Sequence, residues 1–335
     1  MNKPTKGRRD FLIQTLGTGT VIAAGSTMLG AAWANVNAYP TKPIRLIVPF
    51  SAGSATDIMT RILVQHIAGT LKQEFVVDNR VGAAGAVGAD MARRATPDGY
   101  TLVMDAASSH STLAALRPKS LPYNILTDFT SIGRACTSAN MIAVNNDLPV
   151  KNLKELIAYS RQLPKGLSYA AGGSGASNHL AGQILNLHGA NLVHVPYTNL
   201  GQAVIDTISG TVPMLIYTVS LLPFIRQGRI RGIATLSDKR ATQAPELPTA
   251  VEQGVPVIAN SWFGLFGPAK LPLPIRDVLY EALRDAMNDP DVRRKLLDAG
   301  LEPALLNPAE TDAFVVRDIA MWKDVVERAK IPLLD

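Results

Sequence analysis

The sequence predicts an α/β protein with two lobes, each built on a parallel-rich sheet, and three observations lead to this prediction. Apolar β-rich runs alternate with segments of helical period along nearly the whole chain, as in parallel sheets covered by helices. About 300 residues follow the expected leader, more than a single hydrophobic core usually serves. Turns of small residues follow several expected strands, so a ligand can approach the backbone there.

The first 34 residues have the pattern of an export signal. Arg8 and Arg9 form a twin arginine, and residues 11–34 contain no charged side chain. Small residues provide two cleavage sites, ending at Ala34 and Ala38. We therefore predict a twin-arginine signal peptide and a periplasmic protein. The alternative is an uncleaved membrane anchor, but the many Gly, Thr and Ala residues make the run weakly apolar.

The composition argues against several classes of function. The leader holds four basic residues and one acidic residue, so the net charge falls from +6 to +3 when it is removed. The chain has no Lys/Arg cluster with interleaved aromatic residues, and we expect no nucleic-acid partner. The single cysteine, Cys136, cannot form an internal disulfide. The histidines lack the spacing of metal ligands, so we expect no metal ion and no cofactor. We also expect a monomer.

Residues 44–57 are the stretch around which the expected fold is organised. Residues 44–48 form a short apolar run closed by Pro49, which is typical of a buried strand. Apolar residues then recur every fourth position from Met59 to Leu71, so the chain has changed to a helical period. A turn of small residues, 51–54, joins the expected strand to the expected helix.

A second stretch repeats this device more than a hundred residues later. Residues 167–171 are strand-like, residues 172–177 form a turn of small residues, and a helix opens at Asn178. The first turn of a helix leaves N–H groups without intrahelical partners and carries partial positive charge, so an anion can bind there. If the two turns faced each other across a cleft, they would offer an anion two helix N-termini. The alternative is that Ser54 and Asp57 form a capping box that satisfies these groups internally.

The remaining expected elements complete two alternating α/β units. The chain is expected to leave lobe 1 near residue 140 and to return near residue 260, so that lobe 1 comprises residues 39–139 plus 261–335 and lobe 2 comprises residues 140–260. Two crossing strands would then form a hinge beside a cleft. The other expected strands cover residues 75–77, 102–104, 141–144, 192–195, 214–217, 232–235 and 261–267, and the other expected helices cover residues 86–94, 153–161, 202–208, 221–227 and 275–288, with two more starting at Asp289 and Asn307.

Enzyme motifs are incomplete in this chain. Ser174 and His179 suggest a serine hydrolase, but the nucleophile-elbow pattern fails because Ala176 stands where its last glycine belongs. The glycines of residues 82–88 are spaced too widely for a dinucleotide fingerprint, and no Walker lysine follows either turn. We therefore predict a protein that is not an enzyme, with a hydrolase or esterase using Ser174 as the alternative.

Three further stretches are expected to line the same cleft. Ser109 lies in a hydroxyl-rich segment after a strand, where an ordinary helix cap is the alternative. Tyr197 and Thr198 follow another strand, and Tyr217 ends a third. A tyrosine there can present its ring or hydroxyl to a ligand, or it can be buried with its hydroxyl paired.

Six motifs lie at residues 43–50, 78–80, 97–102, 177–182, 193–197 and 261–265. Together they resemble the Bug family of extracytoplasmic solute receptors, the substrate-binding components of tripartite tricarboxylate transporters. The resemblance spans essentially the whole chain after the leader. It implies a type II periplasmic-binding-protein fold with two crossover strands, no catalysis, and capture of a small organic anion, commonly a carboxylate, for delivery to membrane permease subunits.

The resemblance also implies which residues bind the ligand. The resemblance implies that the turn after the first strand, residues 51–57, and the turn before the helix that opens at Asn178, residues 173–178, hold one carboxylate through backbone N–H groups and hydroxyls. The residues expected to bind ligand here are Phe50, Ser51, Gly53, Ser54, Ala55, Thr56, Asp57, Ser109, Gly173, Ser174, Gly175, Ala176, Ser177, Asn178, Tyr197, Thr198 and Tyr217.

The chain departs from the family pattern at three places. Ser54 and Ala55 replace a Gly-Gly pair, and Thr198-Asn199 replaces a Lys-Gly pair. Acidic residues common near residue 214 are absent here. We therefore expect a plain mono- or dicarboxylate, including an aromatic one, rather than an amino-bearing ligand. The alternative to transport is signalling, in which the closed form is presented to a partner protein.

Overall fold

The computed structural model describes residues 39–197 and 199–334. The expected leader lies outside this range. Within it, no helix combines the length and the apolar character needed to cross a membrane.

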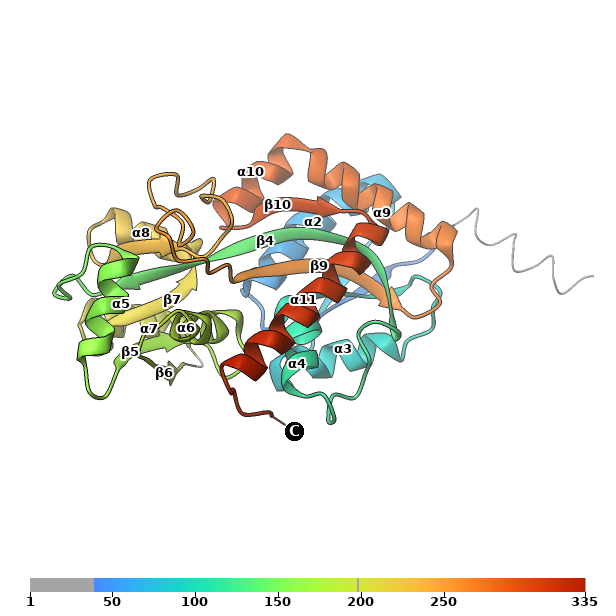
Figure 1. Cartoon of the computed structure of the whole chain (residues 1–335). Helices are drawn as coiled ribbons and strands as arrows, with labels where there is room; N and C mark the ends of the chain where they lie inside the picture. Colours follow the sequence, from blue (N-terminus) through green and yellow to red (C-terminus); the bar gives the residue numbers. More distant parts are fainter. Residues whose placement is uncertain (1–38, 198, 335) are drawn as a thin grey trace, which may run out of the picture. The chain divides into compact units, whose positions relative to one another are not determined.

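The described chain is built on strand β4 (Phe129–Val144), which runs through both lobes (Figure 1). At residues 129–139, β4 pairs with β9 (Asn260–Pro268), and from Asn140 onward it pairs with β7 (Met214–Thr218). The strand order is β2-β1-β3-β9-β4-β7-β5-β6, and β10 and β8 also pair with β4. The other strands are β1 (Ile44–Val48), β2 (Phe75–Asn79), β3 (Thr101–Ala106), β5 (Leu167–Ala171), β6 (Leu192–Pro196), β8 (Arg231–Thr235) and β10 (Glu302–Leu306).

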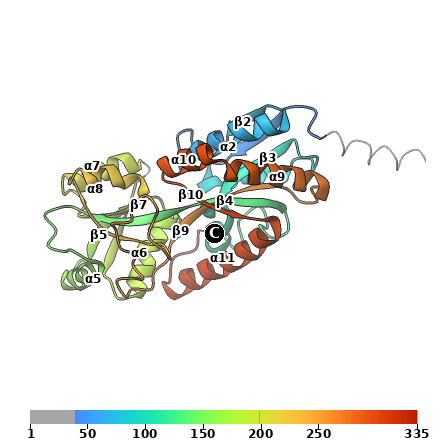
Figure 2. The ribbon, with the colours of Figure 1, turned by 90° about the horizontal axis from the view of Figure 1, so that it is seen from above.

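We call lobe 1 the half of the sheet with β1, β2, β3, β9 and β10, and lobe 2 the half with β5, β6, β7 and β8, each with its helices. Seen from above, helices lie on both sides of β4 in each lobe (Figure 2). The helices of lobe 1 are α2 (Ala55–Leu71), α3 (Ala86–Arg93), α4 (Leu113–Leu116), α9 (Leu273–Asn288), α10 (Pro290–Asp298) and α11 (Pro308–Arg328), with the short turns η2 (Ala83–Gly85) and η3 (Ser108–Thr112). Those of lobe 2 are α5 (Leu153–Gln162), α6 (Ser177–Leu187), α7 (Leu200–Ile208) and α8 (Leu222–Arg226), with the turn η4 (Val219–Leu221).

Helix starts follow local capping chemistry. The side chains of Asn152 and Asp289 accept hydrogen bonds from backbone N–H groups three residues on. Asn307 and Glu310 form a complete capping box ahead of α11, and Pro308 occupies the first helical position. The sequence prediction of these starts is confirmed.

Strand directions make the carboxyl ends of the two lobes' strands point toward each other. β3 is antiparallel to β9, which is antiparallel to β4, so β3 and the parallel β1 and β2 run the same way as β4, toward lobe 2. In lobe 2, β7 is antiparallel to β4, and β5 and β6 run parallel to β7, toward lobe 1. Turns that follow β1 and β5 therefore lie at the junction of the lobes.

The predicted α/β class with two lobes and two crossover strands is confirmed, but two strands were missed. The first part of β4, residues 129–140, and all of β10 were not predicted as strand. β4 carries register shifts against β9 at two places, which interrupt the alternation of apolar and polar residues. β10 contains Pro303 and shows a register shift of its own against β4.

Helix α11 contributes to the cores of both lobes. Val315 and Ile319 pack with the core of lobe 1, whereas Trp322, Val325 and Val326 belong to a cluster with the core of lobe 2. A third connection therefore joins the lobes besides β4 and β9. The exact division into residues 39–139 plus 261–335 and residues 140–260 stays a prediction.

Two histidines and a tyrosine pack tightly behind the β5–α6 turn. The rings of His179 and His194 lie 4.3 Å apart, and Tyr169 donates a 2.8 Å hydrogen bond from its hydroxyl to the carbonyl of His179. Burial, with the neighbouring His194 as a second cause, lowers the pKa of His179 to about 4. His179 and Tyr169 therefore both depend on close packing at helix α6.

We expect Gly182→Ala to destabilise the protein. A methyl group at Gly182 would lie 2.2 Å from Cζ of Tyr169, whose ring is fully buried, so the core must shift. Such overpacking costs about 1–3 kcal/mol. Gly69→Ala is the matched control, because it also lies in a helix but has open space around it, and it should stabilise by up to about 1 kcal/mol. Urea unfolding of both variants checks this, and equal midpoints would contradict the packing.

We expect stability to fall as the pH is lowered from 7 to 5, partly through His179. The folded pKa of about 4 lies below the ordinary value of 6.5, so the unfolded chain binds more protons between these values. The resulting loss from this residue is about 2 kcal/mol at pH 5. Urea midpoints at both pH values should therefore fall less for His179→Asn than for the wild type. Equal falls would show that His179 does not remain neutral in the folded state.

Candidate ligand-binding site

The turn between β1 and α2 is held from within by Asp57. Ser54 caps α2 by accepting a hydrogen bond from the N–H of Asp57, and the Asp57 carboxylate accepts hydrogen bonds from Gly53 N (2.9 Å), Arg61 Nε (3.0 Å) and Asn79 Nδ2 (3.0 Å). Burial alone would raise the pKa of Asp57, but these hydrogen bonds hold it below the ordinary value. Asp57 therefore stays ionised and braces the turn, with its side chain 4% exposed.

This arrangement satisfies only part of the helix N-terminus. The Asp57 carboxylate accepts a hydrogen bond from the N–H of Gly53 rather than from that of Ser54. The capping alternative therefore accounts for one of the N–H groups available at the start of α2. The N–H groups of Ala55 and Thr56 have no acceptor within the helix, and none elsewhere in the described residues. Ser51 is exposed beside them. The turn thus keeps donors for an anion.

The turn between β5 and α6 has the same character. The side chains of Asn178 and His179 accept hydrogen bonds from the N–H groups of Gly172 (3.2 Å) and Gly175 (3.2 Å), which fixes the loop. The Ala176 N–H bonds to a carbonyl inside the turn. Gly173 and Ser174 are exposed, and among the described residues their N–H groups have no partner, like those of Ser177 and Asn178.

Three segments of lobe 1 meet beside the first turn. Gly85 has a φ of +100°, and a Cβ atom there would lie 2.6 Å from Cβ of Ser109 and 3.1 Å from the Phe50 ring. Only glycine fits this contact and this backbone conformation. The predicted residues Phe50 and Ser109 are thus brought together, although they lie 59 positions apart in the sequence.

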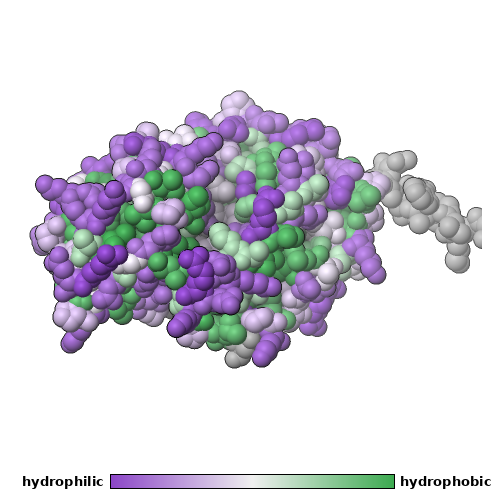
Figure 3. Space-filling model, viewed as in Figure 1, coloured by the Kyte–Doolittle hydropathy of each residue, from purple (hydrophilic) through white to green (hydrophobic). Residues whose placement is uncertain are grey.

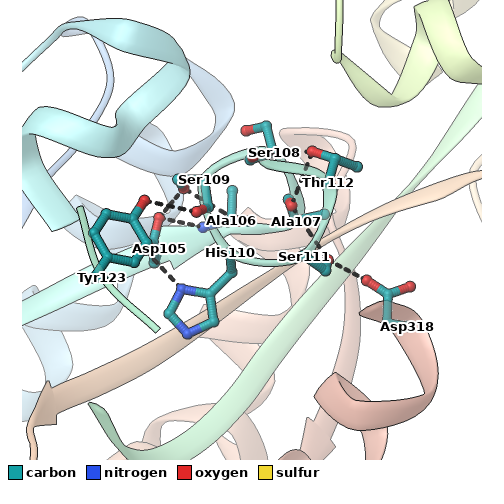
Figure 4. A network of polar contacts seen from close by, with 10 residues as sticks. All are labelled: Asp105, Ala106, Ala107, Ser108, Ser109, His110, Ser111, Thr112, Tyr123 and Asp318. Atoms are coloured by element: carbon teal, nitrogen blue, oxygen red, sulfur yellow. Dashed lines mark hydrogen bonds and ion pairs between the residues drawn. The ribbon is translucent and has the colours of Figure 1, made fainter. Parts of the chain in front are cut away.

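Figure 4 shows that η3, a turn of π-helix, is anchored by a buried carboxylate. Ser109 donates to one oxygen of Asp105, and His110 Nδ1 lies 2.9 Å from the other. Tyr123 donates to the carbonyl of Ser109 at 2.9 Å. Because Ser109 is fully buried and already donates to Asp105, its hydroxyl supports the wall of the site rather than offering an open donor.

The other side of η3 is tied to α11 and to the crossover strand β9. Ser111 points away from Asp105 and donates to Asp318, which also accepts a 2.7 Å hydrogen bond from Trp262 Nε1 (Figure 4). Burial raises the pKa of Asp318, and these two hydrogen bonds offset part of that shift. The position of η3 therefore depends on both lobe 1 and the hinge.

The predicted residues of lobe 2 beyond the turn are placed less favourably. The hydroxyl of Tyr197 donates to Asp206 at 2.7 Å, and this hydrogen bond together with burial raises the pKa of Tyr197 to about 12. Its hydroxyl is therefore already engaged. Tyr217 is half-buried against the apolar cluster of lobe 2. Thr198 lies outside the described residues.

Two asparagines were missed as supports of the site. Asn79 donates to the carbonyl of Phe50 at 2.9 Å as well as to Asp57, so it links β2 to the first turn. Asn140 lies on β4 and donates to Ser177 Oγ (3.3 Å) and to the carbonyl of Ala259 (2.6 Å). The sequence signals for Asn79 are its place two residues after an expected strand and its place in the motif at residues 78–80.

The second turn also touches lobe 1. A methyl group at Gly175 would lie 2.8 Å from Cδ1 of Leu116 in α4, so the β5–α6 turn packs against the helix that follows η3. No hydrogen bond among the described residues joins Ser174 to His179, whose Nδ1 is taken by Gly175. The nucleophile and base of a serine hydrolase are thus not paired.

Known proteins are similar in sequence to most of this chain. Residues 59–331 match the family model described as tripartite tricarboxylate transporter family receptor. BugT of Bordetella pertussis is 31% identical over 299 residues, covering 88% of this chain and 92% of BugT. A Cupriavidus necator protein described as the UPF0065 protein in gbd 5'region is 29% identical over 318 residues, with 92% of this chain and 94% of the relative covered.

Solved structures share the fold at similar identity. The R. palustris protein Rpa4515 with adipate superposes with a TM-score of 0.79 at 29% identity, covering 88% of this chain and 99% of the other. MatC from Rhodopseudomonas palustris with bound malate gives a TM-score of 0.74 at 30% identity, with 86% and 100% covered. The periplasmic binding protein BugD gives 0.76 at 31% identity, with 88% and 99% covered. The chain therefore has the periplasmic-binding-protein fold and belongs to the tripartite tricarboxylate transporter receptor family.

Proposed function

We propose that the chain is a periplasmic receptor that captures a small organic carboxylate between its lobes and delivers it to the permease of a tripartite tricarboxylate transporter. The receptor would act as a monomer after export through the twin-arginine signal. A mono- or dicarboxylate, including an aromatic one, fits this proposal better than an amino acid. Relatives bound to adipate and malate support the substrate class.

One observation carries the proposal. Turns at the carboxyl ends of opposed strands, after β1 and after β5, each keep backbone N–H groups free at a helix N-terminus. A carboxylate near one helix N-terminus is stabilised by about 0.3–1 kcal/mol, and by up to about 2 kcal/mol where it is partly buried. Two such ends acting on one carboxylate favour closure of the lobes around it.

The donors at these turns suit binding rather than catalysis. Both turns offer backbone N–H groups, and the hydroxyls of Ser51 and Ser174 are exposed nearby. His179 is buried, engaged by Gly175, and has a pKa of about 4. A base in this position is poorly matched to proton transfer at neutral pH. We therefore propose a protein without catalytic activity.

We expect simple carboxylates to raise the melting temperature of the purified protein. Adipate, malate and aromatic monocarboxylates should give the larger shifts, because a ligand that binds only the folded state stabilises it by mass action. Amino acids serve as the matched set with an added ammonium group. A screen in which amino acids shift the melting temperature and plain carboxylates do not would overturn the proposed ligand class.

We expect Gly173→Ala to weaken binding of the carboxylate that gives the largest shift by about tenfold, or about 1.4 kcal/mol. A Cβ atom at Gly173 would have open space around it, so the added methyl should leave the melting temperature unchanged but crowd a carboxylate at the turn. Isothermal titration calorimetry measures the affinity, with Gly69→Ala as the control. Unchanged affinity would exclude the β5–α6 turn from the site.

A further inference from the structure

A cavity of about 610 Å³ lies between the two lobes, and of the predicted ligand-binding residues that the structure describes, none lines it. Lobe 1 contributes Arg134 and part of α11, and lobe 2 contributes the segment from Ser237 to Gln243. The volume falls within the range of about 300–1,000 Å³ that is usual for small-molecule sites. Figure 3 shows that the surface is hollowed between the lobes, with hydrophobic surface (green) on both sides of the hollow.

The cavity and the β5–α6 turn lie on opposite faces of strand β4. Successive residues of a strand point to opposite faces of its sheet. Ala139 lines the cavity, whereas the next residue, Asn140, donates a 3.3 Å hydrogen bond to Ser177 Oγ at the turn. A ligand in the cavity would therefore be bound by other groups than the carboxylate proposed for the turns.

The cavity contains a guanidinium group with unused hydrogen-bond donors. Arg134 Nε donates to the carbonyl of Ala304 at 3.0 Å, and Arg134 Cζ lies 4.5 Å from the centre of the Phe314 ring. Among the described residues, the two terminal nitrogens of Arg134 have no hydrogen bond and no ion-pair partner. Burial lowers the pKa of Arg134, but a guanidinium remains protonated at neutral pH. Such a planar pair of charged donors matches the two oxygens of a carboxylate.

The other charged groups of the cavity limit how much negative charge a ligand can carry. Three basic and three acidic side chains line the cavity, so its charges balance. The carboxylates of Glu302 and Asp318 accept hydrogen bonds from neighbouring side chains, and Arg240 is held in an ion pair. Asp238 and Lys239 are exposed. A ligand with one negative group can bind the guanidinium, whereas a second negative group would lie among the acidic side chains and be repelled.

Large apolar side chains are exposed in the walls of the cavity. Ile258, just before β9, is 44% exposed, and Met321 of α11 is 36% exposed. Val219 and Phe314 also line the cavity. Removing such apolar surface from water favours the binding of an apolar group. The cavity thus offers contacts for an apolar ligand body as well as donors for a carboxylate.

We propose that this cavity is a second ligand site, which binds a small monocarboxylate with an apolar body, such as an aromatic acid. The carboxylate accepts hydrogen bonds from the terminal nitrogens of Arg134, and the apolar body packs against Ile258 and Met321. The acidic side chains of the cavity select against dicarboxylates. The two sites therefore differ in their ligands, because the backbone donors of the turns place no such limit on the far end of a ligand.

The test is a titration of the purified protein with 4-fluorobenzoate, followed by fluorine NMR in the presence of saturating adipate. Adipate competes for the turns, so the 4-fluorobenzoate that still binds reports the cavity. Arg134→Met should weaken this binding about ten- to hundredfold, as expected for the loss of hydrogen bonds between charged groups. Gly173→Ala should leave it unchanged. Absence of binding in the presence of adipate, or equal binding by the wild type and Arg134→Met, would overturn the proposal.

A second pair of variants tests the site without changing the buried guanidinium. Met321→Glu places a negative charge in the exposed wall of the cavity and should weaken binding of 4-fluorobenzoate about tenfold. Val316→Glu is the matched control, because Val316 is 51% exposed on the same helix but does not line the cavity, and it should bind like the wild type. Equal affinities of the two glutamate variants would contradict the cavity site. A failure of carboxylate binding at the turns would be seen separately, as an unchanged affinity for adipate in Gly173→Ala.

Discussion

The backbone hydrogen bonds of strand β4 hold both lobes together, and the position of the ligand site depends on them. Ala139 pairs with Asn260 of β9 in lobe 1, and the next residue, Asn140, pairs with Thr218 of β7 in lobe 2. One continuous strand therefore sets the directions of the strands in both lobes. Because of these directions, the turns after β1 and β5 lie at the same junction.

The donors at the two turns are mostly backbone N–H groups, and the first turn is held by a buried carboxylate. The carboxylate of Asp57 accepts hydrogen bonds from Gly53, Arg61 and Asn79. An ionised, buried carboxylate of this kind stiffens the turn. On the proposed function, preorganised N–H groups would bind an anion at little cost in conformational entropy.

The sequence predicted the elements whose patterns are local. β1 and α2 were predicted correctly because an apolar run is followed at once by a four-residue period. The first half of β4 was missed because its polar residues are paired by distant groups. Ser138 donates to the carbonyl of Gly300, and the Arg134 side chain donates to the carbonyl of Ala304, 170 positions away. Such pairing cannot be read from the order of residues alone.

The candidate site likewise contains residues that local sequence patterns predict and residues that they do not. The two turns were found from their small residues, but the supports of the turns were not. Asn79 and Asn140 act through contacts 22 to 119 positions away in the sequence. Ligand binding by the predicted residues stays a prediction, and the hydroxyl of Tyr197 is already engaged by Asp206.

A clamp made of backbone donors explains how the chain can depart from the family pattern in its first turn. Ser54 replaces a glycine, yet its hydroxyl serves as the cap of α2, and the N–H groups of Ala55 and Thr56 do not depend on side-chain identity. On the proposed function, recognition of one carboxylate would therefore tolerate substitution. Selectivity among carboxylates would then come from side chains farther from the turns and from the free energy of lobe closure.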